Sequence, residues 1–125
     1  MENQSIKQVT VVGTGVIGVG WIGRFLAQGY DVIATDIAEN AEERMRAAID
    51  KAWPAIEKHG VAPGASKEKL TFEPDLAKAV ANADLIQENA PEREDIKRKL
   101  LAEIDKYAKP NAIIASSTSG LMPST

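Results

Sequence analysis

The sequence predicts an α/β fold built on a doubly wound, mostly parallel sheet, and three observations support this class. Short apolar runs of strand length alternate with longer segments whose apolar residues recur at helical spacing. A glycine-rich turn, with glycines at positions 13, 15 and 18, joins the first apolar run to the first helical segment. The second run ends at an acidic residue, Asp36. Such alternation is typical of parallel strands joined by helical crossovers.

Length and composition are those of one globular domain, predicted to span residues 1–125. Of these residues 44% are hydrophobic and 26% charged, and the net charge of −3 argues against a nucleic-acid or acidic-membrane partner. The absence of cysteine excludes disulfides and thiolate metal sites and fits a reducing cytoplasm. No apolar run approaches the roughly 20 residues of a membrane span, and the first strand leaves no room for a signal peptide. We therefore expect a cytoplasmic protein without a metal.

The glycine-rich turn follows a predicted strand over residues 6–12 and opens a predicted helix over residues 16–28. Each glycine has a physical reason: Gly13 allows the tight turn, Gly15 lets a pyrophosphate approach the backbone, and Gly18 lets the helix pack closely. The helix N-terminus adds unpaired N–H groups and a positive dipole end. This predicts a dinucleotide site whose residues are Gly13, Thr14, Gly15, Val16, Ile17 and Gly18.

The second predicted strand, residues 31–35, delivers Asp36 about 20 residues beyond the glycines, where a carboxylate binds ribose hydroxyls. Ile37 follows it, so no adjacent arginine is available to receive a 2′-phosphate. The pair Asp36 and Ile37 therefore predicts NAD rather than NADP as the cofactor. The alternative is a glycine-rich turn of another α/β fold, with Asp36 as a helix cap.

A long amphipathic helix is predicted from about residue 40 to residue 60, and it exceeds what a minimal crossover needs. Pro54 is expected to kink it or split it into two pieces. Two interpretations stay open. The helix is an insertion after the second strand with a family-specific function, or Trp53 and Ile56 simply belong to the core.

The second half of the chain predicts strands over residues 70–72, 83–88 and 112–116, with helices over 75–82 and 93–107 between them. The carboxyl ends of parallel strands line the ligand crevice. The loops at residues 89–92 and 117–119 should therefore meet the glycine turn. The alternative is ordinary turn chemistry for the serines and solvated helix-start charge for Glu92 and Lys97.

Four stretches together resemble the NAD-binding domain of the 3-hydroxyacyl-CoA dehydrogenase family over essentially the whole chain: VVGTGVIGVGW, ATDI, QENAPERED and ASSTSGLMPS. Within the family, residues 52–66 and 88–94 are most similar to the branch that oxidises L-carnitine, and the last stretch is also similar to gulonate 3-dehydrogenase and lambda-crystallin. The resemblance implies a Rossmann-type domain, NAD, and a small 3-hydroxy substrate, foremost carnitine. A 3-hydroxyacyl-CoA or gulonate enzyme and a non-catalytic NAD-binding module remain alternatives.

The resemblance also implies roles for residues beyond the glycine turn. It places Ala90 and Glu92 along the nicotinamide side of the cofactor, with Lys97 near by. Ser117, in the loop after the last strand, is predicted to lie at the same half of the cofactor. Ser119 matches the family serine that hydrogen-bonds the substrate's 3-oxygen and is the catalytic residue implied for this chain. Ser117 stands where the acyl-CoA enzymes usually carry asparagine, which favours the carnitine or gulonate branch over an acyl-CoA substrate.

In the family, a histidine paired with a glutamate takes the hydroxyl proton. The one histidine of this sequence, His59, does not match that position and is expected at the surface of a helix end. The catalytic pair and a helical C-terminal domain, which carries the rest of the substrate site and the homodimer contact, are expected beyond Thr125. Residues 1–125 alone are therefore expected to bind NAD without turning over substrate.

Overall fold

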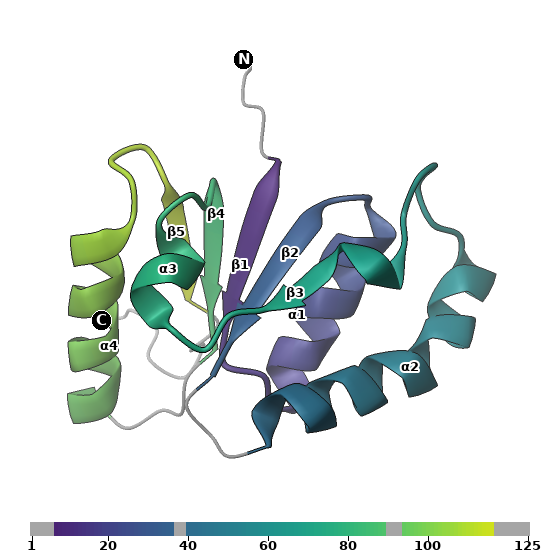
Figure 1. Ribbon diagram of the computed structural model, residues 1–125, viewed down its shortest axis with the longest axis horizontal. Helices are drawn as coiled ribbons and strands as arrows, with labels where there is room; N and C mark the ends of the chain where they lie inside the picture. Colours follow the sequence, from purple (N-terminus) through teal and green to yellow (C-terminus); the bar gives the residue numbers. More distant parts are fainter. Residues whose placement is uncertain (1–6, 37–39, 90–93, 117–125) are drawn as a thin grey trace.

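The computed structural model describes residues 7–36, 40–89 and 94–116 (Figure 1). Five strands form one sheet in the order β3-β2-β1-β4-β5. The strands are β1 (Gln8–Val12), β2 (Asp31–Thr35), β3 (Leu70–Phe72), β4 (Leu85–Glu88) and β5 (Ile113–Ser116). The helices are α1 (Val16–Ala27), α2 (Ala41–His59), α3 (Leu76–Val80) and α4 (Glu94–Tyr107), with a short 3-10 helix η1 (Lys67–Lys69) before β3.

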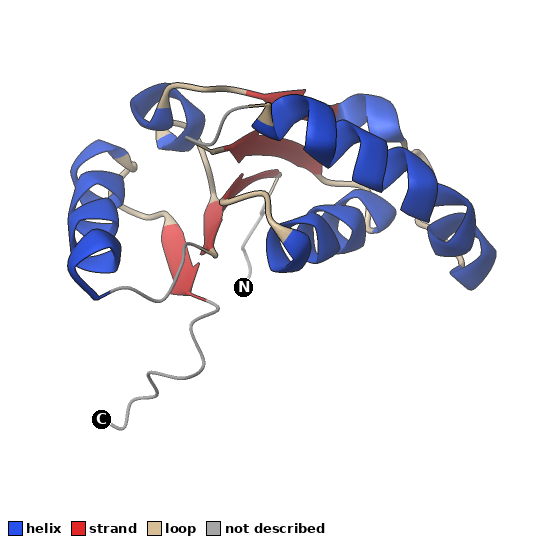
Figure 2. Ribbon diagram, turned by 90° about the horizontal axis from the view of Figure 1, so that it is seen from below, coloured by secondary structure: helices blue, strands red, loops and turns tan. Residues whose placement is uncertain are grey.

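Every pair of neighbouring strands in the sheet is parallel, so all the carboxyl ends lie at the same edge. The chain winds outward from β1 through β2 to β3, then returns to place β4 on the other side of β1. Helices α1 and α2 cover one face of the sheet, and α3 and α4 cover the other (Figure 2). The predicted doubly wound parallel sheet is confirmed, and its topological switch point lies between β1 and β4.

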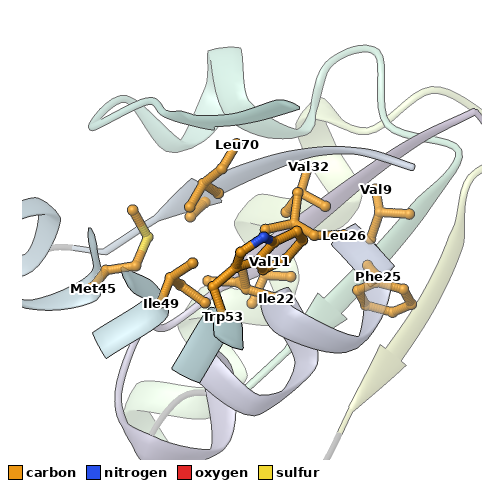
Figure 3. Packing of buried hydrophobic residues seen from close by; sticks show 11 residues of the cluster. Val9, Val11, Ile22, Phe25, Leu26, Val32, Met45, Ile49, Trp53 and Leu70 are labelled. Atoms are coloured by element: carbon orange, nitrogen blue, oxygen red, sulfur yellow. The ribbon is translucent and has the colours of Figure 1, made fainter. Parts of the chain in front are cut away.

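The larger core lies between the sheet and helices α1 and α2 (Figure 3). Met45, Ile49 and Trp53 of α2 are buried in it, and Ile56 packs against it. The interpretation of this helix as part of the core is therefore confirmed. Of the two outcomes expected at Pro54, a kink or a split, the split is wrong, because α2 continues through this residue as one helix. Apolar contacts on both sides of Pro54 offset the one backbone hydrogen bond that a proline removes.

The smaller core lies on the opposite face, between the sheet and helices α3 and α4. Its buried members are Val12, Val80, Ala83, Ile86 and Ile104. Leu100 and Leu101 of α4 pack against them. Asp75 caps the start of α3, because its carboxylate accepts a hydrogen bond of 3.0 Å from the Ala77 N–H.

At the opposite edge of the sheet from the glycine turn, Asp84 joins three segments just before β4 begins. Its carboxylate accepts hydrogen bonds from the backbone N–H groups of Lys7 at 2.8 Å and Gln8 at 3.0 Å, and it pairs with the Lys109 ammonium. The hydrogen bond from Lys109, followed by those from the two backbone groups, lowers the pKa of Asp84 from 3.8 to about 2. This anchor joins residues more than 70 positions apart, which no local pattern in the sequence reveals.

An acid with a lower pKa in the folded than in the unfolded chain stabilises the fold above the unfolded pKa. That contribution is lost as the pH falls through the folded pKa, which for Asp84 is about 2. We expect Asp84→Asn to lower the free energy of unfolding by about 1 kcal/mol near neutral pH, and the deficit to shrink below about pH 4. Urea unfolding across this pH range measures it. The control is Asp105→Asn, at an exposed position of α4, and a pH-independent deficit would contradict the assignment.

Candidate functional site

The glycine turn between β1 and α1 is shaped by two of its three motif glycines. Gly13 has a φ of 96°, a conformation that residues with a side chain rarely adopt, and its N–H donates to the Thr35 carbonyl at 2.8 Å. At Gly18, an added Cβ would lie 1.9 Å from the Gly13 carbonyl oxygen. The first turn of α1 therefore packs directly on the backbone that leaves β1. This close approach is the one that the motif spacing predicted for Gly18.

Gly15, the middle glycine, lies in a different environment. It is exposed, and a Cβ built on it would meet no atom within 4 Å among the described residues. Helix α1 begins at the next residue, and its first backbone bond runs from the Val19 N–H to the Gly15 carbonyl at 2.8 Å. The N–H groups of a first helical turn have no partner within the helix, and the dipole there favours an anion. The turn thus offers open backbone, N–H donors and no acidic side chain in the first turn of α1.

Asp36 follows β2 at the same edge of the sheet, as predicted. Its Oδ2 atom accepts two hydrogen bonds from Thr14, one from the backbone N–H at 2.7 Å and one from the side-chain hydroxyl at 2.8 Å. The carboxylate is therefore held against the first half of the glycine turn. A negative group, which suits ribose hydroxyls, therefore lies directly beside N–H groups that suit a pyrophosphate, as dinucleotide binding requires.

The end of β4 also reaches this edge. The Asn89 N–H donates to the Val12 carbonyl at 2.8 Å, and the Asn89 side-chain nitrogen lies 3.6 Å from the position of a Cβ built on Gly18. Gln87 and Glu88, the last two residues of β4, are buried. The structure thus brings the start of the 89–92 loop next to the glycine turn. The sequence placed Asn89 in this loop without giving it a role, and its position directly after a central strand was the available signal.

Several predicted site residues lie outside the described residues. They are Ile37, Ala90, Glu92, Ser117 and Ser119. The predictions for the side chains of Val16, Ile17 and Lys97 likewise lie outside the described side chains, although their backbone is helical. The roles assigned to all of these residues stay predictions.

His59 lies exposed in the last turn of α2, the surface position predicted for it. Within residues 7–36, 40–89 and 94–116, no three histidine or acidic side chains gather into a possible metal site. None of the helices in those ranges has the length and apolar character needed to cross a membrane.

Comparisons with known proteins converge on one family. A family model described as "3-hydroxyacyl-CoA dehydrogenase, NAD binding domain" matches residues 8–125. An L-carnitine dehydrogenase from Bacillus cereus is 73% identical over 124 residues, which are 99% of this chain and 38% of that protein. An L-carnitine dehydrogenase from Pseudomonas putida is 55% identical over 119 residues, 95% of this chain and 37% of that protein. The chain thus spans less than two fifths of the length of these relatives.

Solved structures agree with the sequence comparisons. A diketoreductase superposes with a TM-score of 0.84 at 32% identity, covering 98% of this chain and 45% of that one. The (S)-3-hydroxybutyryl-CoA dehydrogenase of Ralstonia eutropha gives a TM-score of 0.80 at 28% identity, covering 92% of this chain and 42% of that one. In each case the match covers less than half of the solved chain.

Proposed function

The chain belongs to the 3-hydroxyacyl-CoA dehydrogenase family as an NAD-binding domain, and from this we propose that it carries the cofactor for the oxidation of a small 3-hydroxy acid. L-Carnitine, oxidised to 3-dehydrocarnitine, is the substrate we infer first. Support for it comes from relatives named L-carnitine dehydrogenase, which are 49–73% identical to this chain. The observation that carries the cofactor assignment is the open backbone at Gly15, beside the N-terminus of α1 and the Asp36 carboxylate.

We infer that the turn from Gly13 to Gly18 holds the pyrophosphate. The described residues leave room for this group, because a Cβ built on Gly15 meets no atom within 4 Å beyond its chain neighbours. Asp36 would accept hydrogen bonds from the adenosine ribose hydroxyls. NAD, when bound, supplies the acceptor for the hydride that leaves the substrate's carbinol carbon.

The remaining site assignments follow the resemblance of the sequence to the family. Ala90, Glu92, Lys97 and Ser117 would lie along the nicotinamide half, and Ser119 would donate a hydrogen bond to the substrate's 3-oxygen. The proton of the reacting hydroxyl needs a base with a pKa near the working pH. His59 is exposed at the end of α2, so we propose that this base comes from another part of the complete protein.

The experiment that tests the proposed reaction is an assay of the complete gene product for NADH formation. L-Carnitine, L-gulonate and a 3-hydroxyacyl-CoA are compared at equal concentration. We expect carnitine to give the highest kcat/KM. Faster oxidation of gulonate or of the acyl-CoA would replace carnitine as the substrate, and no turnover with any of them would support a non-catalytic NAD-binding module.

Cofactor choice is a separate prediction about Asp36. Its carboxylate accepts from ribose hydroxyls and repels the charged 2′-phosphate of NADP. We expect NAD to bind at least tenfold more tightly than NADP, a difference of about 1.4 kcal/mol. Asp36→Ala should narrow this gap. Calorimetric titration of both cofactors measures it, with Asp31→Ala, an exposed change at the other end of the same strand, as the control. Equal affinities in the wild-type protein would contradict the assignment.

A further inference from the structure

Thr14 links the glycine turn to the end of β2 through hydrogen bonds that the spacing of the motif glycines does not itself require. Thr14 is 9% exposed, and its hydroxyl and its backbone N–H both donate to the same oxygen of Asp36. The neighbouring Gly13 N–H donates to the Thr35 carbonyl at 2.8 Å. Three hydrogen bonds therefore hold the first half of the turn against the end of β2. One of the three, the hydroxyl bond, depends on the identity of the side chain at position 14.

The two bonds from Thr14 restrict the direction of the Asp36 carboxylate. Donors that converge on one oxygen restrict rotation of the group, and donation to a charged acceptor is stronger than donation to a neutral one. A carboxylate can accept about four hydrogen bonds, so the two from Thr14 do not by themselves use up its acceptor capacity. The hydroxyl of Thr14 thus acts on the group that discriminates between the two cofactors, while the backbone of the same residue belongs to the turn.

We propose that Thr14 is a positioning residue for cofactor discrimination. Its hydroxyl holds the Asp36 carboxylate in the orientation that accepts the ribose hydroxyls and opposes a 2′-phosphate. This inference rests on the proposed function, in which the adenosine ribose of NAD lies at Asp36. It goes further by assigning part of the preference for NAD to a side chain that need not touch the ribose.

Thr14→Val tests the proposal because valine keeps the branched shape and the backbone N–H and removes only the hydroxyl. We expect the ratio of NADP to NAD dissociation constants to fall by about 3- to 10-fold, in the range of one hydrogen bond. Thr14→Ser, which keeps the donor, should retain the wild-type ratio within about twofold. Calorimetric titration of NAD and NADP into the complete protein measures both.

Thr10→Val is the matched control. Thr10 is also buried, and its hydroxyl donates to the Ala79 carbonyl at 2.6 Å on the α3 side of the sheet. This variant loses a buried threonine hydrogen bond away from the glycine turn. Its melting temperature should therefore fall, while the ratio of NADP to NAD dissociation constants stays unchanged. A fall in the ratio for Thr10→Val as large as that for Thr14→Val would overturn the proposal, since general destabilisation would then explain both.

A double-mutant cycle separates the inference from the proposed function. If Thr14 acts through Asp36, the double variant Asp36→Ala with Thr14→Val should have the same ratio of NADP to NAD dissociation constants as Asp36→Ala alone. An additive effect would overturn the proposal. If Asp36→Ala loses the preference for NAD while Thr14→Val keeps it within about twofold, the role of Thr14 is wrong and the role of Asp36 stands. If Asp36→Ala keeps the preference, the proposed role of Asp36 is wrong and the inference falls with it.

Discussion

Gly15→Val is expected to weaken NAD binding by at least about a hundredfold, or about 2.7 kcal/mol, while the protein stays folded. The backbone of Gly15 is extended, with φ −72° and ψ −165°, a conformation that valine adopts readily. Apart from the two neighbouring residues, no described atom lies within 4 Å of a Cβ built on Gly15, so the described residues leave room for the start of the new side chain. The branched side chain would instead occupy the space that we assign to the pyrophosphate. Calorimetric titration of NAD measures the loss.

The stability cost of this change should be small. Glycine is a better residue than valine at the N-cap position that Gly15 occupies, so we expect a loss of about 1 kcal/mol. Gly20→Val is the control, because Gly20 is also exposed with no atom within 4 Å of an added Cβ, yet it lies inside α1. It should bind NAD at nearly wild-type strength. A folded Gly15→Val protein that binds NAD as tightly as wild type would show that the pyrophosphate does not lie against Gly15.

Gly18→Ala, unlike Gly15→Val, is expected to have a large effect on the fold itself. Its new Cβ would lie 1.9 Å from the Gly13 carbonyl oxygen and 2.9 Å from the carbonyl carbon, and both are backbone atoms. Helix α1 or the turn must therefore move. Forcing extra atoms into a packed site costs about 1–3 kcal/mol and occasionally more, and we expect the upper part of this range. Displacing the turn should weaken NAD binding as well.

Thermal or urea unfolding of Gly18→Ala measures this cost, and a second alanine substitution in the same helix provides the contrast. Gly20→Ala meets no atom within 4 Å, so it should stabilise the protein by about 0.5–1 kcal/mol through helix propensity alone. The two substitutions add the same methyl group two residues apart and should shift the midpoint in opposite directions. A Gly18→Ala protein as stable as wild type would contradict the close approach of α1 to the turn.

The local features of the fold could be predicted from the sequence because each is encoded within a few residues. Strands β2 and β3 have the predicted bounds. Helix α1 begins at Val16 as predicted, because the glycine turn marks where β1 ends and the helix begins. Asp36 lies where the motif spacing placed it. The continuity of α2 through Pro54 could not be predicted from local propensity, because contacts with α1 and the sheet outweigh the lost hydrogen bond.

The same local patterns could not predict contacts between residues that are far apart in the sequence. The bonds from Thr14 to Asp36 join residues 22 positions apart, and the bond from Lys7 to Asp84 joins residues 77 positions apart. Their partners are set by the strand order, which periodicity in a single sequence does not specify. The motif therefore identified the glycine turn and the acidic residue, but it did not reveal that the two are joined through a threonine hydroxyl.

The most direct test of the central claim, that NAD lies along the glycine turn with its ribose at Asp36, is a crystal structure of the protein with NAD bound. We expect the pyrophosphate to contact the backbone at Gly15 and the first turn of α1, and the adenosine ribose hydroxyls to donate to the Asp36 carboxylate, with the Thr14 hydroxyl still bonded to it. NAD bound away from the carboxyl ends of β1 and β4, or a ribose that does not contact Asp36, would contradict the account.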